Sequence, residues 1–185
     1  MTEGTAEFLI RPARESDLDV IAGFEIDIAR ASFGDEAIED AALHRRRVAA
    51  ALGKPGEVTL VAVAVQGKGE EGMERPAGGG GEGAPVGWAW LSGRTNSLTG
   101  ARYGNFRSLA TADVPGRASV AELLMAAVVQ AAAQAGYAHL TGKTHARNLG
   151  MRALYRKYGF EATHLTMEWR PGATAERAGG GEAGR

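Results

Sequence analysis

The sequence contains no cysteine and no long run of apolar residues. Without cysteine the chain can form no disulfide, and it offers no thiol nucleophile and no cysteine-based zinc site. No apolar stretch reaches the roughly 18 residues that a membrane-spanning helix requires. The first residues also lack the cationic and apolar segments of a secretory signal. We therefore expect a soluble cytoplasmic protein without a membrane partner.

The chain also lacks an excess of charge of either sign. Its 21 lysine and arginine residues are balanced by 22 aspartate and glutamate residues, which gives a formal charge of −1. Nucleic-acid binders normally carry a strong basic excess or a basic stripe, so this class is disfavoured. The one basic run, residues 45–47, is better explained as part of a solvated helix face.

The 27 glycines are concentrated in two segments of the 185-residue chain. Residues 67–83 and 172–185 hold too few apolar side chains to offset the entropy of ordering them. We therefore predict one domain over residues 1–170, with a flexible glycine-rich loop at 67–84 and a disordered tail at 171–185. The loop separates two strand-like runs, residues 58–65 and 86–91, which predicts a hairpin.

The rest of the chain alternates between strand and helix patterns. Helices are predicted from Ser16 onward and at about residues 37–52, 119–135 and 150–158; further strands are predicted at residues 8–11, 105–112, 139–143 and 160–169. This order is typical of an α/β (α+β) fold that is built on one central sheet.

The C-terminal half holds the most informative motif. Asn148 and Tyr155 are seven residues apart, close to two helical turns, so they can face the same side of one element. Tyr155 opens the run YRKYGF, in which Gly159 and Phe160 follow. In this spacing, and in the opening run at residues 8–21, the chain resembles the GNAT superfamily of acyl-CoA N-acyltransferases over about residues 7–170.

The resemblance implies a mixed, mostly antiparallel sheet that is splayed between two strands and flanked by about four helices. Acyl-CoA, most simply acetyl-CoA, would enter between the strands at residues 105–112 and 139–143, with no metal required. Its pantetheine arm would pair with the backbone of Ala110, Thr111 and Ala112. Tyr155 would protonate the departing thiolate, and Asn148 would hydrogen-bond the cofactor. From the residues alone, Tyr155 fits a core aromatic and Asn148 a helix N-cap equally well.

The segment that matches the family's pyrophosphate loop departs from the family pattern. The position of its arginine or glutamine is Pro115, and its two small positions are Ala118 and Val120, where the branched valine would crowd the phosphates. Ser119 and Glu122 also fit a capping box, which would compete for the same backbone N–H groups. Arg117 could compensate as a direct phosphate ligand, so we predict cofactor contacts from Arg117, Ala118, Ser119 and Val120.

The general base is left open among four residues: Glu25, Asp27, Asp113 and His145. The histidines show no spacing typical of a metal site.

The leading hypothesis is transfer of acetyl from acetyl-CoA to a primary amine by direct attack, with a small molecule or a peptide as acceptor. The family often forms homodimers, so the resemblance allows one here. The alternative is a GNAT-like fold with a degenerate CoA site that serves as a binding or regulatory module.

Overall fold

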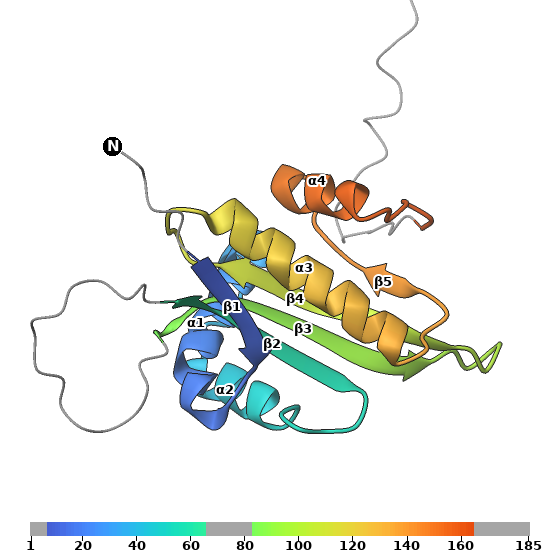
Figure 1. Ribbon diagram of the computed structural model, residues 1–185, viewed down its shortest axis with the longest axis horizontal. Helices are drawn as coiled ribbons and strands as arrows, with labels where there is room; N and C mark the ends of the chain where they lie inside the picture. The colour runs from blue at the N-terminus through green and yellow to red at the C-terminus, as the bar shows by residue number, and fades with distance from the viewer. Residues whose placement is uncertain (1–6, 66–82, 165–185) are drawn as a thin grey trace, which may run out of the picture.

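The computed structural model describes residues 7–65 and 83–164. Within them a five-stranded sheet is flanked by helices on both faces (Figure 1). The strands are β1 (Glu7–Pro12), β2 (Glu57–Val65), β3 (Pro85–Thr95), β4 (Arg102–Thr111) and β5 (Leu140–Gly142). The helices are α1 (Leu18–Phe33), α2 (Ala41–Ala49), α3 (Arg117–Gln134) and α4 (Leu149–Lys157), with short 3₁₀ turns η1 (Glu15–Asp17) and η2 (Gly34–Glu36). The expected α/β fold class is confirmed.

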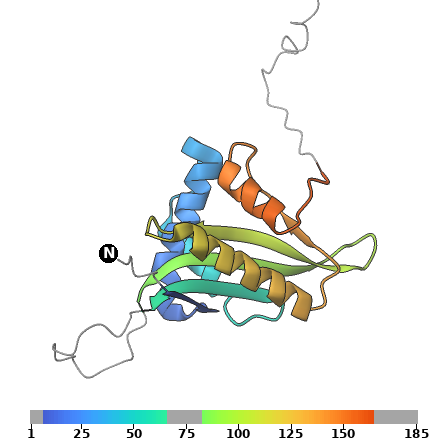
Figure 2. The ribbon, with the colours of Figure 1, turned by 45° about the horizontal axis from the view of Figure 1, so that its top comes forward.

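The strands lie in the order in which they occur along the chain, β1-β2-β3-β4-β5. The first four pair antiparallel, whereas β5 pairs parallel to β4. A parallel neighbour requires a crossover connection, and α3 provides it across one face of the sheet (Figure 2). The sheet is therefore mixed but mostly antiparallel, as the resemblance implies.

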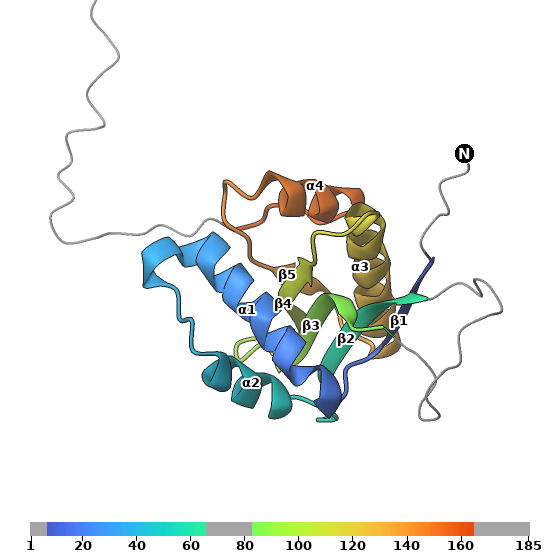
Figure 3. The same cartoon turned by 90° about the vertical axis from the view of Figure 1, so that its left-hand side faces the viewer.

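Alternation of side chains along the strands divides the interior into two cores. Trp88 and Trp90 of β3 pack with α1 and α2 on one face, while Ala89 and Leu91 pack with α3 on the other. Figure 3 shows this arrangement, with α1 and α2 on one side of the sheet and α3 on the other. Because side chains alternate between faces of a strand, one buried strand serves both cores.

The predicted elements differ from the observed ones mainly at their ends. Helix α2 begins at Ala41 and not near residue 37, because the Asp40 carboxylate accepts a hydrogen bond from the Leu43 N–H (3.1 Å) and caps the helix there. The strand predicted at residues 160–169 is absent from residues 160–164, which have no regular structure. Its remainder, most of the glycine-rich loop and the tail lie outside the described residues.

No helix in residues 7–65 and 83–164 is both long enough and apolar enough to cross a membrane.

Candidate functional site

Strand β5 leaves its neighbour β4 after a short pairing. The two strands are in register over three pairs, of which the last is Phe106 with Gly142. Strand β4 continues to Thr111, still paired with β3 on its other side. Residues 107–111 therefore form an edge with no strand beside it in the described part of the chain. We call this segment the open edge of β4.

A β-bulge marks the point where the open edge begins. Trp90 pairs with Ser108 while Leu91 pairs with Phe106, so Arg107 is an extra residue in β4. Such bulges increase the local twist and redirect the side chain that they carry. Local patterns in the sequence do not predict this bulge, because it depends on the register between two strands.

The backbone groups at the open edge are those of alternate residues. The Ala112 N–H donates a hydrogen bond to the carbonyl of Val86 in β3 (2.8 Å). Because successive residues of an antiparallel strand direct their backbone groups to opposite sides, Leu109 and Thr111 direct theirs to the open edge. The prediction for Ala110 and Ala112 is thus corrected: their backbone faces β3, and their side chains pack against the α1 side. Leu109 was missed.

Tyr155, in the last turn of α4, lies directly over the end of β5. Its ring packs against Phe106 and Phe160, with ring centres 6.2 and 4.8 Å away. A Cβ at position 142 would overlap the Tyr155 hydroxyl, so this close approach requires Gly142. Burial raises the pKa of Tyr155 to about 12. Tyr155 is partly buried, and its hydroxyl forms no hydrogen bond with a described residue, so a polar atom is available where β5 leaves β4.

Asn148 caps the N-terminus of α4. Its side-chain oxygen accepts a hydrogen bond from the Met151 N–H (3.0 Å). The side-chain oxygen therefore acts as a helix cap. The side-chain NH₂ group makes no hydrogen bond within the described residues. Contact between this NH₂ group and a cofactor remains a prediction.

The N-terminus of α3 lies beyond the end of β4 and begins earlier than predicted. Gly116 adopts a left-handed conformation (φ 81°) and starts the helix at Arg117. The Val120 N–H donates to the Gly116 carbonyl (3.1 Å), and the Val120 side chain is fully buried. The Val120 side chain therefore does not crowd this helix terminus, and its N–H group is not available to a phosphate. The expected steric crowding by Val120 and the predicted cofactor contact of its N–H group are both corrected. The N–H groups of Ala118 and Ser119 have no acceptor in the described residues.

The predicted capping box is wrong. Ser119 lies inside the helix, and the N-cap residue Gly116 has no side chain that could cap. The Glu122 carboxylate instead bonds the Lys157 ammonium of α4 (2.6 Å), and the Tyr158 hydroxyl donates to the Glu122 carbonyl (2.9 Å). These contacts tie α4 to α3 and place a cation beside the negative charge of Glu122.

Comparison with solved structures identifies the architecture. A structure of aminoglycoside N-acetyltransferase AAC(6')-Iy in complex with CoA superposes with a TM-score of 0.64 at 18% identity, covering 92% of this chain and 98% of that one. A Trypanosoma brucei acetyltransferase gives 0.60 at 19% identity, with coverages of 89% and 99%. A ribosomal-protein-alanine N-acetyltransferase from Brucella melitensis biovar Abortus 2308 gives 0.58 at 16% identity, with coverages of 89% and 99%. The chain has the GNAT acyltransferase fold. No protein-family model and no curated protein sequence matches it.

The GNAT fold places only one of the four candidate bases inside the molecule. Glu25 of α1 is buried under the sheet, where its carboxylate accepts a hydrogen bond from the Trp88 indole N–H (2.8 Å). Asp27 lies on the surface near Arg30, and Asp113 pairs with Arg117 (3.1 Å) on the surface. The fourth candidate, His145, is exposed, and its Nδ1 accepts from the Arg147 N–H (3.1 Å).

The same face of the GNAT sheet holds a polar cluster that the sequence analysis missed. The Glu57 carboxylate accepts hydrogen bonds from the Trp90 indole (2.7 Å) and the Ser92 hydroxyl (2.6 Å). The Arg107 guanidinium from the bulge lies over the Trp90 ring, 4.1 Å from its centre. These residues come from separate parts of the chain, so no local spacing could have revealed them.

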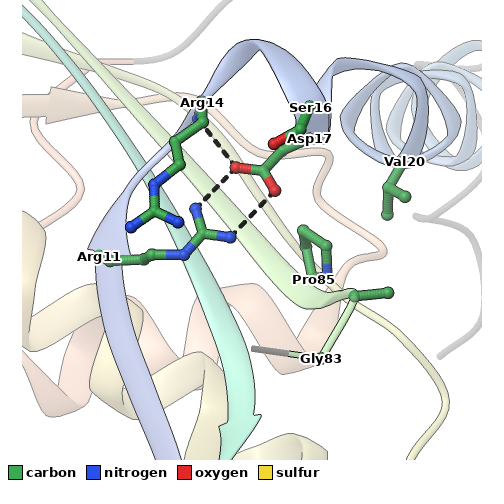
Figure 4. A pocket seen from close by; sticks show the side chains of 8 residues that line it. Arg11, Arg14, Ser16, Asp17, Val20, Gly83 and Pro85 are labelled. Atoms are coloured by element: carbon green, nitrogen blue, oxygen red, sulfur yellow. Dashed lines mark hydrogen bonds and ion pairs between the residues drawn. The ribbon is translucent and has the colours of Figure 1, made fainter. Parts of the chain in front are cut away.

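A cleft beside the N-terminal end of α1 contains a nearly buried ion pair between Arg11 and Asp17 (Figure 4). Asp17 accepts two hydrogen bonds from the Arg11 guanidinium (2.7 and 3.0 Å) and one from the Arg14 N–H (2.8 Å). Burial alone would raise the pKa of Asp17, but these hydrogen bonds and the charge of Arg11 outweigh it and lower the pKa. We call this arrangement the β1–α1 corner.

Within residues 7–65 and 83–164, no group of three or more histidine or acidic side chains could hold a metal ion.

Proposed function

We propose that the protein is an N-acyltransferase that moves an acyl group, most simply acetyl, from acyl-CoA to a primary amine. The observation that supports this most directly is the unbonded hydroxyl of Tyr155 at the point where β5 leaves β4. The hydroxyl forms no hydrogen bond with a described residue, so it can donate one to a group that enters where the two strands separate. A solved structure with this fold contains CoA, which is consistent with the proposal.

The cofactor would lie along the open edge of β4 toward the start of α3. The pantetheine amides would pair with the backbone of Leu109 and Thr111. The pyrophosphate would accept hydrogen bonds from the N–H groups of Ala118 and Ser119, since helix N-termini favour anions. Arg117 begins the helix, and within the described residues its guanidinium pairs only with the exposed Asp113, a contact weak enough for it to turn toward a phosphate.

The acceptor amine must reach the thioester carbon in its neutral form. An ordinary alkylamine has a pKa of about 10.4, so removing its proton at pH 7 costs about 5 kcal/mol. Glu25 is the described candidate base that lies on the α1 face of the sheet, and it would take this proton directly or through water. In the proposed reaction the amine attacks the thioester carbon directly, and without cysteine the chain can form no cysteine thioester intermediate.

Tyr155 would stabilise the departing sulfur. Its pKa of about 12 keeps the hydroxyl protonated at neutral pH, so it can donate a hydrogen bond but cannot serve as a base. A thiol has a pKa of about 8.5, so complete transfer of the proton would be uphill by about 5 kcal/mol. We therefore expect the hydroxyl to bond the developing thiolate, with net protonation coming from the amine after attack.

Calorimetric titration with acetyl-CoA, and with CoA as a control, tests the cofactor part of the proposal. We expect saturable binding at micromolar concentrations. Turnover would then be followed with a thiol reagent in the presence of amines; the protein contributes no background, since it contains no cysteine. No saturable binding at millimolar acetyl-CoA would overturn the proposal and favour the alternative, a GNAT-like binding or regulatory module.

A further inference from the structure

Three arginines that form no ion pair with a described residue lie on the α1 side of the sheet, and one of them, Arg107, stands where the open edge of β4 begins. Arg107 projects from the bulge, and Arg94 follows Trp90 and Ser92 on the same face of β3. Arg47 lies in the last turn of α2, which covers that face. None of the three forms an ion pair with a described residue. We call Arg47, Arg94 and Arg107 the arginine cluster.

Two carboxylates, those of Glu57 and Glu25, lie near the cluster, but neither forms an ion pair with it. Glu57 accepts from Trp90 and Ser92, and Glu25 accepts from Trp88. Burial lowers the pKa of Arg107, and the charges of Arg47 and Arg94 lower it further, while Glu57 and Glu25 oppose this shift. The half-buried Arg107 guanidinium thus has two other arginines and two carboxylates nearby but no ion-paired anion among the described residues.

The position of Arg107 is fixed by the structure around it. Its Cζ lies over the Trp90 ring, 4.1 Å from the ring centre, and the Trp90 indole N–H donates to Glu57. A guanidinium that lies over a ring face can still donate from its N–H edges, and those edges match a carboxylate with two parallel hydrogen bonds. A preorganised arginine therefore loses less entropy when it binds an anion.

We propose that the arginine cluster binds a carboxylate of the acceptor, so that the amine substrate is an amino acid or a similar amino-carboxylate. The inference rests on the proposed acyl transfer and names its substrate class. Arg107 lies two residues along β4 from Leu109, a separation of about 7 Å. An acceptor of a few bonds' length can therefore place its carboxylate at Arg107 while its amine approaches the open edge.

Matched acceptors test the inference through activity. Amino acids with a terminal amine, from glycine to 6-aminohexanoate, would be compared with alkylamines of the same chain length. We expect the best amino-carboxylate to have a kcat/KM at least tenfold above its alkylamine. In Arg107→Gln this preference should fall to less than threefold, while Arg107→Lys, which keeps the charge without the paired N–H edges, should be intermediate.

Arg45→Gln is the matched control. Arg45 belongs to the same helix as Arg47, but it pairs with Asp19 (2.9 Å) away from the cluster. It should retain the full preference for amino-carboxylates. Equal loss in Arg45→Gln and Arg107→Gln would show a general effect of surface charge and would overturn the inference.

A binding measurement separates this inference from the proposed acyl transfer. Succinate would be titrated without CoA while tryptophan emission is recorded at constant ionic strength, because an anion at Arg107 should perturb Trp90. We expect saturation in the wild type and at least tenfold weaker binding in Arg107→Gln. Turnover of amines without any preference for carboxylates, or succinate binding that Arg107→Gln leaves unchanged, overturns the inference alone. Succinate binding without any turnover supports the anion site and overturns the acyl transfer.

Discussion

The β1–α1 corner and the open edge of β4 use polar groups in opposite ways. At the corner, Asp17 receives three hydrogen bonds from Arg11 and Arg14 within one short stretch of chain. Near the open edge, the Tyr155 hydroxyl and the N–H groups of Ala118 and Ser119 have no partner among the described residues. Polar groups that bond one another stabilise the fold, whereas unbonded groups are available to a ligand.

This difference predicts that the two regions can be separated by mutation. Changes at the corner should alter the free energy of unfolding and leave acetyl-CoA binding unchanged. Changes at Tyr155 should alter turnover and leave the free energy of unfolding unchanged. A result in which both regions affect both quantities would show that the site depends on the corner.

The largest expected effect is that of Asp17→Asn. The substitution keeps the side-chain volume but removes the negative charge that the nearly buried Arg11 guanidinium pairs with at 2.7 Å. Breaking such a pair from one side lowers the free energy of unfolding by about 3 kcal/mol or more. Urea denaturation measures the change, and Asp19→Asn, which removes an exposed partner of Arg45, should change it by less than about 0.5 kcal/mol. Similar values for both variants would contradict the assigned role of the corner.

The same carboxylate makes stability depend on acid pH. The pKa of Asp17 in the folded protein lies below its ordinary value of 3.8. Its contribution is therefore fully present above that ordinary value and is lost as the pH falls toward the lower, folded pKa. Unfolding measured from pH 7 to pH 2 should show the difference between wild type and Asp17→Asn shrinking below about pH 4. A difference that stays constant over this range would mean that the ionised carboxylate is not the stabilising group.

At the open edge, Tyr155→Phe should reduce turnover at least tenfold, which corresponds to about 1.4 kcal/mol in the barrier. The hydroxyl has no described partner, so the free energy of unfolding and the Kd for acetyl-CoA should remain close to the wild-type values. Steady-state kinetics, calorimetry and urea denaturation provide the three measurements.

The matched control for Tyr155→Phe is Tyr158→Phe, three residues further along the chain. Tyr158 donates a hydrogen bond to the Glu122 carbonyl (2.9 Å), so its loss should cost about 1 kcal/mol of stability with turnover changed less than threefold. Equal turnover in Tyr155→Phe and wild type would remove Tyr155 from the proposed mechanism.

Local patterns in the sequence were sufficient to predict most of the fold. Apolar periodicity and the Asn148–Tyr155 spacing predicted α1 and α4 in their correct places, because these signals lie within one element. The start of α3 was missed although Pro115-Gly116 was visible, since the Ser119–Glu122 pattern offered a competing cap. The Gly116 conformation decided between them by starting the helix at Arg117.

The site was harder to predict because its geometry depends on registers between strands. The bulge at Arg107 exists only in the pairing of β4 with β3, and the choice of Leu109 and Thr111 as exposed backbone follows from that pairing. Tyr155 was predicted from its motif, but its contact with Gly142 requires α4 to pack over β5. Contacts between distant elements leave no spacing in the sequence.

The smallest expected effect is at the start of α3. Lys157 bonds the Glu122 carboxylate (2.6 Å), so Lys157→Gln would leave a negative charge near the proposed pyrophosphate position. Charge effects near helix ends are modest, and we expect acetyl-CoA to bind about twofold more weakly at low salt, with less change at high salt. Adding Glu122→Gln should restore the affinity, because it removes the charge that Lys157 neutralises. Calorimetry on the single and double variants measures both steps; weaker binding in the double variant than in Lys157→Gln would mean that the pair acts by holding α4 in place and not through its charge.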